Sequence, residues 1–293
     1  MASTREIRLR IRSVKNIAQI TRAQQMVASS KMRRAQERVL ASRPYAEQLQ
    51  KLLARLASQA EGQEDLPLMQ SRPVRKVGIV VLSPDRGLAG ALPGNINRRA
   101  GRLALDLRRE YNDPNLPISF VVVGRKGRDF LVRTRQPILA EFTQLGDNPS
   151  LANVRAVARA ITDAYLNEDV DRALLVYPRY VSTVVQTPTV LQLLPVQPPE
   201  GIAVEGPPPQ YIFEPDATTI FAELLPRYLE TLIYQPLLET IASFYSAQMV
   251  AMRNATDNAN DLLADLTLTY NKARQAAITN QILEIVSGAN ALS

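Results

Sequence analysis

The side chains that most often carry enzyme chemistry are missing from this sequence. Its 293 residues include no histidine and no cysteine. The chain therefore lacks the commonest general base and metal ligand, and it lacks thiolate nucleophiles, thiolate metal ligands and disulfides. We predict no catalytic residue and no metal-binding residue.

Two turns remain as candidates for chemistry, because each follows a predicted buried strand. They are Pro84–Gly90 (PDRGLAG) and Gly124–Arg128, and folds with parallel strands bind ligands at such junctions. However, no G-x-G-x-x-G follows the first strand, and G-x-x-x-x-G-K-[ST] occurs nowhere in the chain. We therefore expect no nucleotide or other cofactor, and we interpret these glycines as residues of tight turns.

Positive charge is concentrated at one end of the chain. The net charge is +7, but residues 1–60 hold 13 Lys/Arg and 3 Asp/Glu, so the remainder is mildly acidic. A basic arm implies an acidic partner, and nucleic acid, anionic lipid and an acidic protein surface all qualify. No apolar run approaches the ~18 residues that a bilayer span requires, so we expect no insertion into a membrane.

The N-terminal arm has the pattern of a helix that winds around a partner helix. Residues 1–43 contain neither glycine nor proline. Stripe residues spaced alternately by four and three are typical of such a helix. The stripe comprises Ile7, Ile11, Val14, Ala18, Thr21, Gln25, Ala28, Met32, Ala35 and Val39, and past Pro44 it continues as Ala46, Leu49, Leu53, Leu56 and Ala60. The Arg-rich start also resembles a mitochondrial presequence, but because the stripe stays in register from Ile7 to Val39 we expect a mature helix and no cleaved leader.

The C-terminal arm supplies the partner helix. Leu237–Ser287 are 51 consecutive residues without glycine or proline. Their stripe comprises Ile241, Tyr245, Gln248, Met252, Ala255, Ala259, Leu262, Leu266, Thr269, Ala273 and Ala276. Because the two arms are the two ends of the chain, an antiparallel pair is the simplest arrangement. Two separate amphipathic helices on a core are the alternative, but a compact core needs neither helix to be so long. We expect Pro226 and Pro236 to bend or interrupt the first turns of this arm.

The middle of the chain alternates between predicted strands and helices. Strands are predicted at 76–83, 118–123, 138–142, 172–180 and 187–196, with helices near 95–111, 126–135 and 151–167. This alternation predicts a three-layer α/β, Rossmann-like domain with a mostly parallel sheet. The predicted fold class is therefore α+β by segment, with a long antiparallel coiled coil of the N- and C-terminal helices around that inserted domain.

We divide the chain into four predicted parts. Residues 1–60 form the N-terminal coiled-coil helix, 74–196 the central α/β domain, 197–217 a proline-rich connector, and 218–293 the C-terminal coiled-coil helix. The connector boundary rests on seven prolines between Pro195 and Pro215, which favour an extended backbone.

Several stretches resemble the gamma subunit of F-type ATP synthase over essentially the whole chain. The terminal ones are REIRLRIRSVKNIAQITRA, MVASSKMRRAQ and MVAMRNATDNANDLLADLTLTYNKARQAAITNQILEIVSGANA, and the middle ones are SPDRGLAG, GDNPSL and YIFEPD. Two departures are visible. Gln281 stands where the family usually has an acid, two residues after Ile278-Thr279, and Ala89 stands where some relatives have cysteine.

The resemblance implies a non-catalytic rotary shaft that couples rotation of a membrane ring to conformational change at catalytic sites on an alpha/beta hexamer. Its implied partners are the ATP synthase alpha and beta subunits, the epsilon subunit and the membrane ring of proton-carrying subunits, with one copy of the chain per complex. The implied location is peripheral, on the cytoplasmic face of the bacterial plasma membrane. We expect no turnover by the isolated chain.

The resemblance also suggests three groups of contact residues. Contacts with the surrounding stator are expected at Arg10, Arg33, Arg34, Arg38, Arg253, Asn254, Asp257, Asn258, Asp261, Arg274, Gln275 and Thr279, for which a solvated helix face is the alternative. An apolar shaft tip is expected at Ile278, Ile282, Ile285, Val286 and Ala289, although Ile278 and Ile282 equally fit a longer coiled-coil core. A foot on the membrane ring is expected at Tyr211, Glu214 and Asp216, and helix capping is the alternative role of the two acids.

Two rival classes of function remain at this point. A basic coiled-coil nucleic-acid-binding or scaffold protein would use the N-terminal arm, although that arm has one aromatic residue, Tyr45, and no base-reading module. A free-standing α/β enzyme would leave the long arms unexplained and lacks histidine, cysteine and a phosphate loop. We therefore predict that nucleic acid is not a partner.

Overall fold

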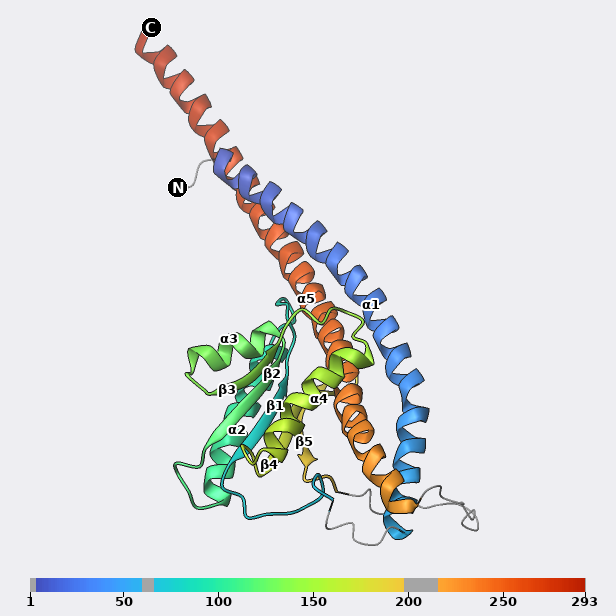
Figure 1. The fold of residues 1–293 in the computed structure, drawn as a ribbon. Helices are drawn as coiled ribbons and strands as arrows, with labels where there is room; N and C mark the ends of the chain where they lie inside the picture. The colour runs from blue at the N-terminus through green and yellow to red at the C-terminus, as the bar shows by residue number, and fades with distance from the viewer. Residues whose placement is uncertain (1–3, 60–65, 198–215, 293) are drawn as a thin grey trace. The chain divides into compact units, whose positions relative to one another are not determined.

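Two long terminal helices flank an α/β region in the computed structural model, which describes residues 4–59, 66–197 and 216–292 (Figure 1). The elements in chain order are α1 (Thr4–Gln59), β1 (Val77–Leu82), α2 (Leu92–Glu110), β2 (Ile118–Val123), α3 (Arg125–Arg133), β3 (Ile138–Phe142), α4 (Leu151–Leu166), β4 (Arg172–Tyr180), β5 (Gln186–Leu194) and α5 (Ala217–Leu292). Helices α1 and α5 contain 56 and 76 residues. The predicted class, long terminal helices around an inserted sheet, is confirmed. Most of the proline-rich connector, at 198–215, lies outside the described residues.

The chain divides into two compact units, which are described separately. The first contains Met1–Ser29 and Gln248–Ser293, and the second contains Ser30–Ala247. Each unit therefore includes part of α1 and part of α5.

In the first unit, α1 and α5 run antiparallel. Arg8 donates a hydrogen bond to the Tyr270 hydroxyl, and further along, the hydroxyl oxygens of Thr21 and Thr256 lie 2.7 Å apart. As the residue number rises on one helix it falls on the other, which confirms the predicted antiparallel pair. The buried positions are mostly small, such as Ala18, Ala28 and Ala259, so the two backbones approach closely while burying little apolar area.

The seam of α5 differs from the predicted stripe at four positions, Ala255, Leu262, Thr269 and Ala276. Leu263 and Tyr270 are partly buried, whereas Leu262 is 47% exposed and Thr269 is also exposed. The observed seam comprises Met252, Thr256, Ala259, Leu263, Leu266, Tyr270 and Ala273, and it keeps the four-three spacing. The prediction of Leu262 and Thr269 was wrong because adjacent leucines and the polar seam residue Thr256 leave the periodicity ambiguous by one residue.

This register leads to a first prediction. Leu263→Ala should lower the free energy of unfolding by about 1 kcal/mol, because a partly buried leucine side chain loses its apolar contacts. Leu262→Ala, the same change one residue away on the exposed side, should have much less effect. Urea unfolding of the two variants, followed by circular dichroism, measures both values. A larger loss for Leu262→Ala would contradict the observed seam.

In the second unit, the five strands form one sheet with the order β3-β2-β1-β4-β5. Strands β1, β2, β3 and β4 are parallel to their neighbours, and β5 pairs antiparallel with β4. The chain adds β2 and β3 on one side of β1 and then returns to add β4 on the other. The sheet therefore has a topological switch point between β1 and β4, the place where folds of this class bind ligands beyond the carboxyl ends of the strands.

Helices cover both faces of this sheet. One face carries an apolar cluster to which β1 contributes Val80 and Leu82 and β2 contributes Val121. The helices that complete this cluster are α4 with Ile161, α5 with Leu225, Leu229, Ile233 and Leu237, and α1 with Leu53 and Leu56. On the other face, Phe120 of β2 lines a groove with α2 and α3. The result is the predicted three-layer arrangement, with parts of both long helices belonging to one outer layer.

The long helices continue through their prolines. Pro44 lies inside α1, and Pro226 and Pro236 lie inside α5. Of the two predicted effects of Pro226 and Pro236, interruption of the helix was therefore wrong, and a bend stays a prediction. Each proline removes one amide donor, but Phe221, Leu229 and Leu237 are buried around these sites, and their packing offsets the loss.

Candidate functional site

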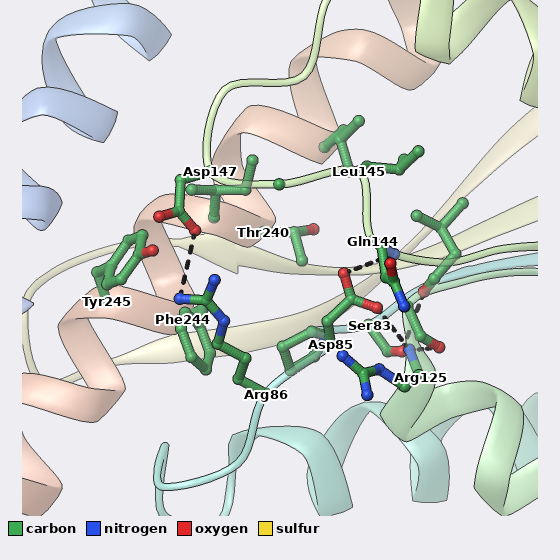
Figure 2. Close-up of a pocket in the computed structure, with 16 residues that line it drawn as sticks. Ser83, Asp85, Arg86, Arg125, Gln144, Leu145, Asp147, Thr240, Phe244 and Tyr245 are labelled. Carbon is green, nitrogen blue, oxygen red and sulfur yellow. Dashed lines mark hydrogen bonds and ion pairs between the residues drawn. The ribbon is translucent and has the colours of Figure 1, made fainter.

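A cavity of about 350 Å³ opens at the carboxyl ends of β1, β2 and β3, beside α5 (Figure 2). Its polar lining includes Asp85 and Arg86 after β1, Arg125 after β2, and Gln144 and Asp147 after β3. Its apolar lining comes mainly from α5 and includes Leu237, Ile241 and Phe244. It lies on the β1–β2–β3 side of the sheet and not at the switch point between β1 and β4, where folds of this class bind nucleotides.

Helix α3 begins at the rim of this cavity, and its N-terminal amides are bonded within the chain. The amide of Arg125 donates to Asp85 Oδ1 at 3.0 Å, that of Lys126 to the Pro84 carbonyl at 3.1 Å, and that of Gly127 to Ser83 Oγ at 2.7 Å. Phosphate binding at a helix N-terminus depends on free amides of this kind. The Asp85 carboxylate accepts from the N-terminus of α3 in the position that a bound anion would take.

Close packing between the β1 and β2 ends reinforces this arrangement. Gly124 has a φ of +92°, and a Cβ added there would lie 1.9 Å from the Ser83 carbonyl oxygen. Ser83 Oγ also donates to the Val123 carbonyl at 3.0 Å. A Cβ added at Gly127, inside α3, would lie 2.6 Å from Ser83 Oγ, so close packing against Ser83 requires glycine at both positions, whereas the sequence had suggested only tight turns.

A second feature of the cavity rim is a cluster of polar side chains centred on Asp147. Lys31 Nζ of α1 lies 2.7 Å from Asp147 Oδ2, and Arg86 Nη1 lies 4.0 Å from Oδ1. Arg38 Nη1 of α1 donates to the Asp147 carbonyl at 2.8 Å. Burial acts to raise the pKa of Asp147, but hydrogen bonds from Lys31 and Tyr245 and the charges of Lys31 and Arg86 outweigh it, so the pKa lies below its ordinary value. Burial and the neighbouring Asp147 carboxylate raise the pKa of Tyr245 above its ordinary range.

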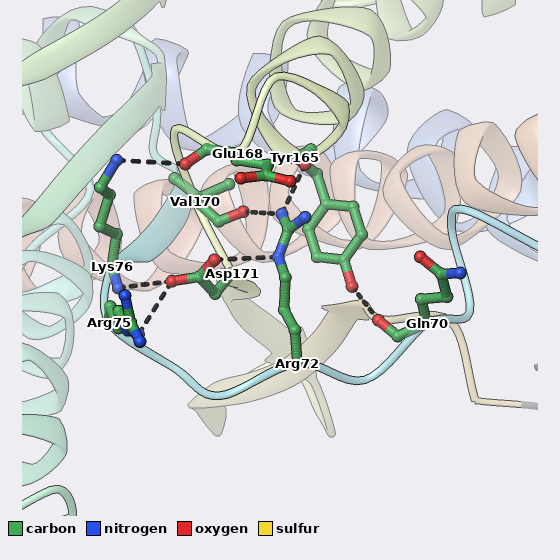
Figure 3. Close-up of polar contacts among 8 residues, drawn as sticks. All are labelled: Gln70, Arg72, Arg75, Lys76, Tyr165, Glu168, Val170 and Asp171. Carbon is green, nitrogen blue, oxygen red and sulfur yellow. Dashed lines mark hydrogen bonds and ion pairs between the residues drawn. The ribbon is translucent and has the colours of Figure 1, made fainter.

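A third cluster anchors the segment that enters β1 (Figure 3). Asp171 accepts the amides of Arg75 and Lys76 at 2.8 and 2.9 Å, and Arg72 Nε lies 2.9 Å from its other oxygen. The Arg72 guanidinium also donates to the Tyr165 and Val170 carbonyls and lies over the Tyr165 ring. These contacts hold the segment before β1 against the residues that follow α4.

Most of the predicted stator-contact residues are exposed. In the first unit, Arg253 and Asp257 form an ion pair with an N–O distance of 4.0 Å. The Thr279 hydroxyl donates a hydrogen bond to the Gln275 carbonyl of its own helix. The remaining exposed contact residues of this unit are Arg10, Asn254, Asn258, Asp261 and Arg274. In the second unit, Arg33 and Arg34 are exposed, but Arg38 is partly buried because it bonds Asp147. Arg38 therefore differs from the other arginines of the basic face.

The predicted apolar tip is exposed along α5. Ile278, Ile282, Ile285 and Val286 are between 48% and 71% exposed, so within the described residues Ile278 and Ile282 do not extend the coiled-coil core. The backbone of Ala289 is helical, but its side chain lies outside the described residues.

The predicted foot is described only at Asp216. Tyr211 and Glu214 lie outside the described residues. Asp216 is exposed, and its carboxylate accepts the Thr219 amide at 2.8 Å and the Thr219 hydroxyl at 2.7 Å. Asp216 therefore caps the N-terminus of α5, which is the alternative role that the sequence suggested.

The sequence reasoning missed a second basic region on the outer layer of the sheet. Residues 92–136 hold ten Lys/Arg against four Asp/Glu. A groove of about 340 Å³ runs between α2 and α3, with Arg98, Arg102 and Arg108 among its lining and Leu105 exposed. Treating everything after residue 60 as one mildly acidic block concealed this region, and a charge count in short windows would have found it.

The described residues contain no candidate metal site and no candidate membrane span. Within 4–59, 66–197 and 216–292, no group of three or more carboxylate side chains is placed to hold a metal ion. No helix in the same ranges is both long enough and apolar enough to cross a membrane.

Comparison with known proteins agrees with this picture of a structural chain. Residues 3–292 match the protein family described as ATP synthase. The ATP synthase gamma chain of Dehalococcoides mccartyi strain CBDB1 is 49% identical over 297 residues, which cover 100% of both chains. That of Roseiflexus castenholzii is 49% identical over 294 residues, covering 100% of this chain and 99% of the relative.

Solved structures of ATP synthases share the fold. A chain of the Euglena gracilis mitochondrial ATP synthase, containing OSCP, F1 and the c-ring, aligns over 99% of this chain and 94% of its own length with a TM-score of 0.66 and 17% identity. A chain of the Tetrahymena thermophila central stalk and c-ring structure aligns over 80% and 99%, with a TM-score of 0.61 and 22% identity. The fold is thus one found in the rotary ATP synthases.

The chain belongs to the ATP synthase gamma chain family. The resemblance stated from the sequence motifs is confirmed, and with it the assignment as a non-catalytic subunit with the role of a rotary shaft. The alternative of a nucleic-acid-binding or scaffold coiled coil is not favoured.

Proposed function

We propose that this chain is the central shaft of a proton-translocating F-type ATP synthase, present in one copy and held by the alpha, beta and epsilon subunits and the membrane ring. Membership of a membrane-associated ATP synthase complex follows from the family. The proposed position is peripheral, on the cytoplasmic face of a bacterial plasma membrane.

The observation that carries this proposal is the free end of α5. After Ala273, every residue of α5 up to Ser287 is exposed, and several of them are large and apolar. Isolated helices of a few turns are marginal in water, so a helix end with this composition is expected to be covered by partner subunits. A sleeve formed by the alpha/beta hexamer would cover it without a fixed hydrogen bond that hinders rotation.

Energetics favour shape and stiffness over single charges as the means of coupling. Shifting a catalytic site from 1:99 to 99:1 between two conformations takes about 5.5 kcal/mol of differential contact energy. Exposed ion pairs contribute under ~1 kcal/mol each, so Arg10, Arg33 or Arg34 alone would not supply it. We propose that these arginines face acidic loops of the beta subunit and refine the position of the shaft.

The other contact groups keep the roles that the family resemblance suggested. Arg253, Asn254, Asp257, Asn258 and Asp261 form a polar face of α5 toward the inner wall of the stator, and Arg274, Gln275 and Thr279 meet the catalytic subunits near the tip. The foot comprises Tyr211 and Glu214, with Asp216 at the start of α5.

The test of this function is assembly followed by rotation. The full chain is co-expressed with alpha, beta and epsilon subunits carrying one affinity tag on beta, and the purified complex is immobilised with a bead attached to this chain. We expect stable co-purification and bead rotation during ATP hydrolysis. Failure to co-purify, or ATP turnover by the isolated chain, would overturn the proposal.

A second prediction concerns the basic face of α1. Arg33→Ala with Arg34→Ala should lower rotation torque and ATP hydrolysis about two- to fivefold, since losing two exposed charge pairs removes up to about 1 kcal/mol of contact energy. Arg38 is left unchanged because it bonds Asp147. Arg109→Ala, an exposed arginine on α2, is the matched control. If torque and hydrolysis both stay at the control level, the proposed contact with the beta subunit is wrong.

A further inference from the structure

Among the described residues, the polar contacts between the β3–α4 loop and α1 all involve Asp147. Its carboxylate pairs with Lys31 at 2.7 Å, and its backbone carbonyl accepts from Arg38 at 2.8 Å. Lys31 and Arg38 are seven residues apart, so they lie on one face of α1, two turns from each other. Asp147 thus contacts α1 at two positions about two turns apart, at Lys31 through its side chain and at Arg38 through its backbone carbonyl.

The other end of this contact is fixed in the α/β layer. Just before Asp147, the Gln144 amide donates to Asp85 Oδ2 at 3.0 Å, and the Phe142 carbonyl accepts from the Gly124 amide at 2.8 Å. Just after it, Ser150 starts α4 with a reciprocal capping arrangement with Asn153. A force on Asp147 therefore passes into the turns after β1 and β2 and into the first turn of α4.

Both long helices are attached to the α/β layer through its apolar core, α1 by Leu49, Leu53 and Leu56 near its C-terminal end. Helix α5 contributes Leu225, Leu229 and Ile233 to the apolar core, all nearly inaccessible to solvent. Between Lys31 and Val39, by contrast, the buried residues of α1 are Ala35 and Val39, and both pack against α5. In this part of α1 the connection to the β3–α4 loop is polar.

The Lys31–Asp147 pair is poorly suited to a role in stability alone. Its side chains are 36% and 41% exposed, and ion pairs at that exposure contribute little to the free energy of folding. Such a pair instead restricts how α1 can move relative to the β3–α4 loop. Lys31, Arg38 and Arg86 approach Asp147 from α1 and from the β1–α2 turn, so α1 cannot slide or turn against the loop without breaking contacts.

We propose that Asp147 is a positioning residue for rotary coupling, which fixes the part of α1 between Lys31 and Arg38 to the α/β layer, so that torque entering that layer reaches α1 here as well as through its core residues. This inference rests on the proposed shaft function. Synthesis of ATP requires torque to pass from the α/β layer into both helices, whereas hydrolysis by the hexamer turns the helices directly. Loss of the Asp147 contact should therefore impair synthesis more than hydrolysis.

The experiment compares proton-driven ATP synthesis with ATP hydrolysis in the assembled complex reconstituted into vesicles. Asp147→Asn and Lys31→Gln should each lower synthesis about three- to tenfold while changing hydrolysis and complex yield less than twofold. Asp106→Asn breaks an exposed pair with Arg99 on α2 that does not involve α1, and it should leave both rates unchanged. Lys31→Arg, which keeps the positive charge, should retain most of the synthesis rate.

A covalent rescue separates positioning from charge. The chain has no cysteine, so Lys31→Cys with Asp147→Cys places its only two thiols at this contact. Synthesis should fall in this double variant and recover after treatment with a short bis-maleimide, with the same reagent on the parent complex as the control. Recovery supports a positioning role.

Three results would overturn the inference. Equal losses of synthesis, hydrolysis and yield in Asp147→Asn would mean that the contact only supports folding. Unchanged rates in Asp147→Asn would mean that it transmits no torque, and loss of synthesis without recovery after cross-linking would mean that charge, not attachment, is required. Failure of the shaft function itself is distinct, because the unmodified chain would then neither assemble nor rotate.

Discussion

Gly124→Ala should lower the free energy of unfolding of the second unit by about 3 kcal/mol or more. Two costs combine at this position. The φ of +92° is a conformation that side chains rarely adopt, and the new Cβ would lie 1.9 Å from the Ser83 carbonyl oxygen, a backbone atom that cannot rotate away. The turns after β1 and β2 would have to separate, which would also break the bonds that hold α3.

Gly146→Ala is the matched control for this prediction. Gly146 also has a positive φ, of +77°, but an added Cβ would meet nothing within 4 Å. This variant should cost only the backbone strain, ~1–2 kcal/mol. Urea unfolding of the full chain, followed by tyrosine fluorescence, gives both values. Equal losses in the two variants would show that the backbone conformation, and not the close approach to Ser83, limits position 124.

Asp171→Ala should cost about 3 kcal/mol, because it leaves a partly buried guanidinium and two amides without their acceptor. The Asp171 side chain is 11% exposed and that of Arg72 is 27% exposed, so water compensates only in part. Arg72 would keep its bonds to the Tyr165 and Val170 carbonyls, which limits the loss. The segment leading into β1 should then loosen, since Arg75 and Lys76 are bonded to the same carboxylate.

Hydrogen exchange shows where in the chain Asp171→Ala loosens the structure and by how much. The amides of Arg75 and Lys76 should exchange faster in Asp171→Ala, while those in the middle of β1 stay protected until global unfolding. Asp169→Ala, an exposed acid two residues earlier, should leave both the midpoint of unfolding and these exchange rates unchanged. Unaltered exchange at Arg75 and Lys76 would mean that Asp171 does not anchor this segment.

Local patterns were sufficient to predict most of the architecture. The strands 118–123, 138–142 and 172–180 were predicted with their observed bounds, because each is a run of apolar or β-branched residues between turn residues. The N-terminal stripe was also predictable. Its residues Ile7, Ala18, Ala28, Ala35, Val39, Ala46, Leu49, Leu53 and Leu56 are all buried, and periodicity is a property of neighbouring residues.

Contacts between distant residues were not predictable in this way. Nothing near Asp85 indicates that its carboxylate accepts amides from Arg125 and Gln144, 40 and 59 residues away. The same holds for Lys31 and Asp147, which are 116 residues apart. The choice of Leu263 over Leu262 depended on how α1 packs, and periodicity within α5 could not supply that information.

The closed N-terminus of α3 has a consequence for chemical intervention. Ser83, Pro84 and Asp85 supply acceptors from the chain itself to the first amides of α3, so hydrogen bonds join the turns after β1 and β2 at this helix end. Anionic compounds are therefore poor starting points for drugs directed at the N-terminus of α3. An inhibitor that acts at this position would instead have to separate α3 from the turn after β1.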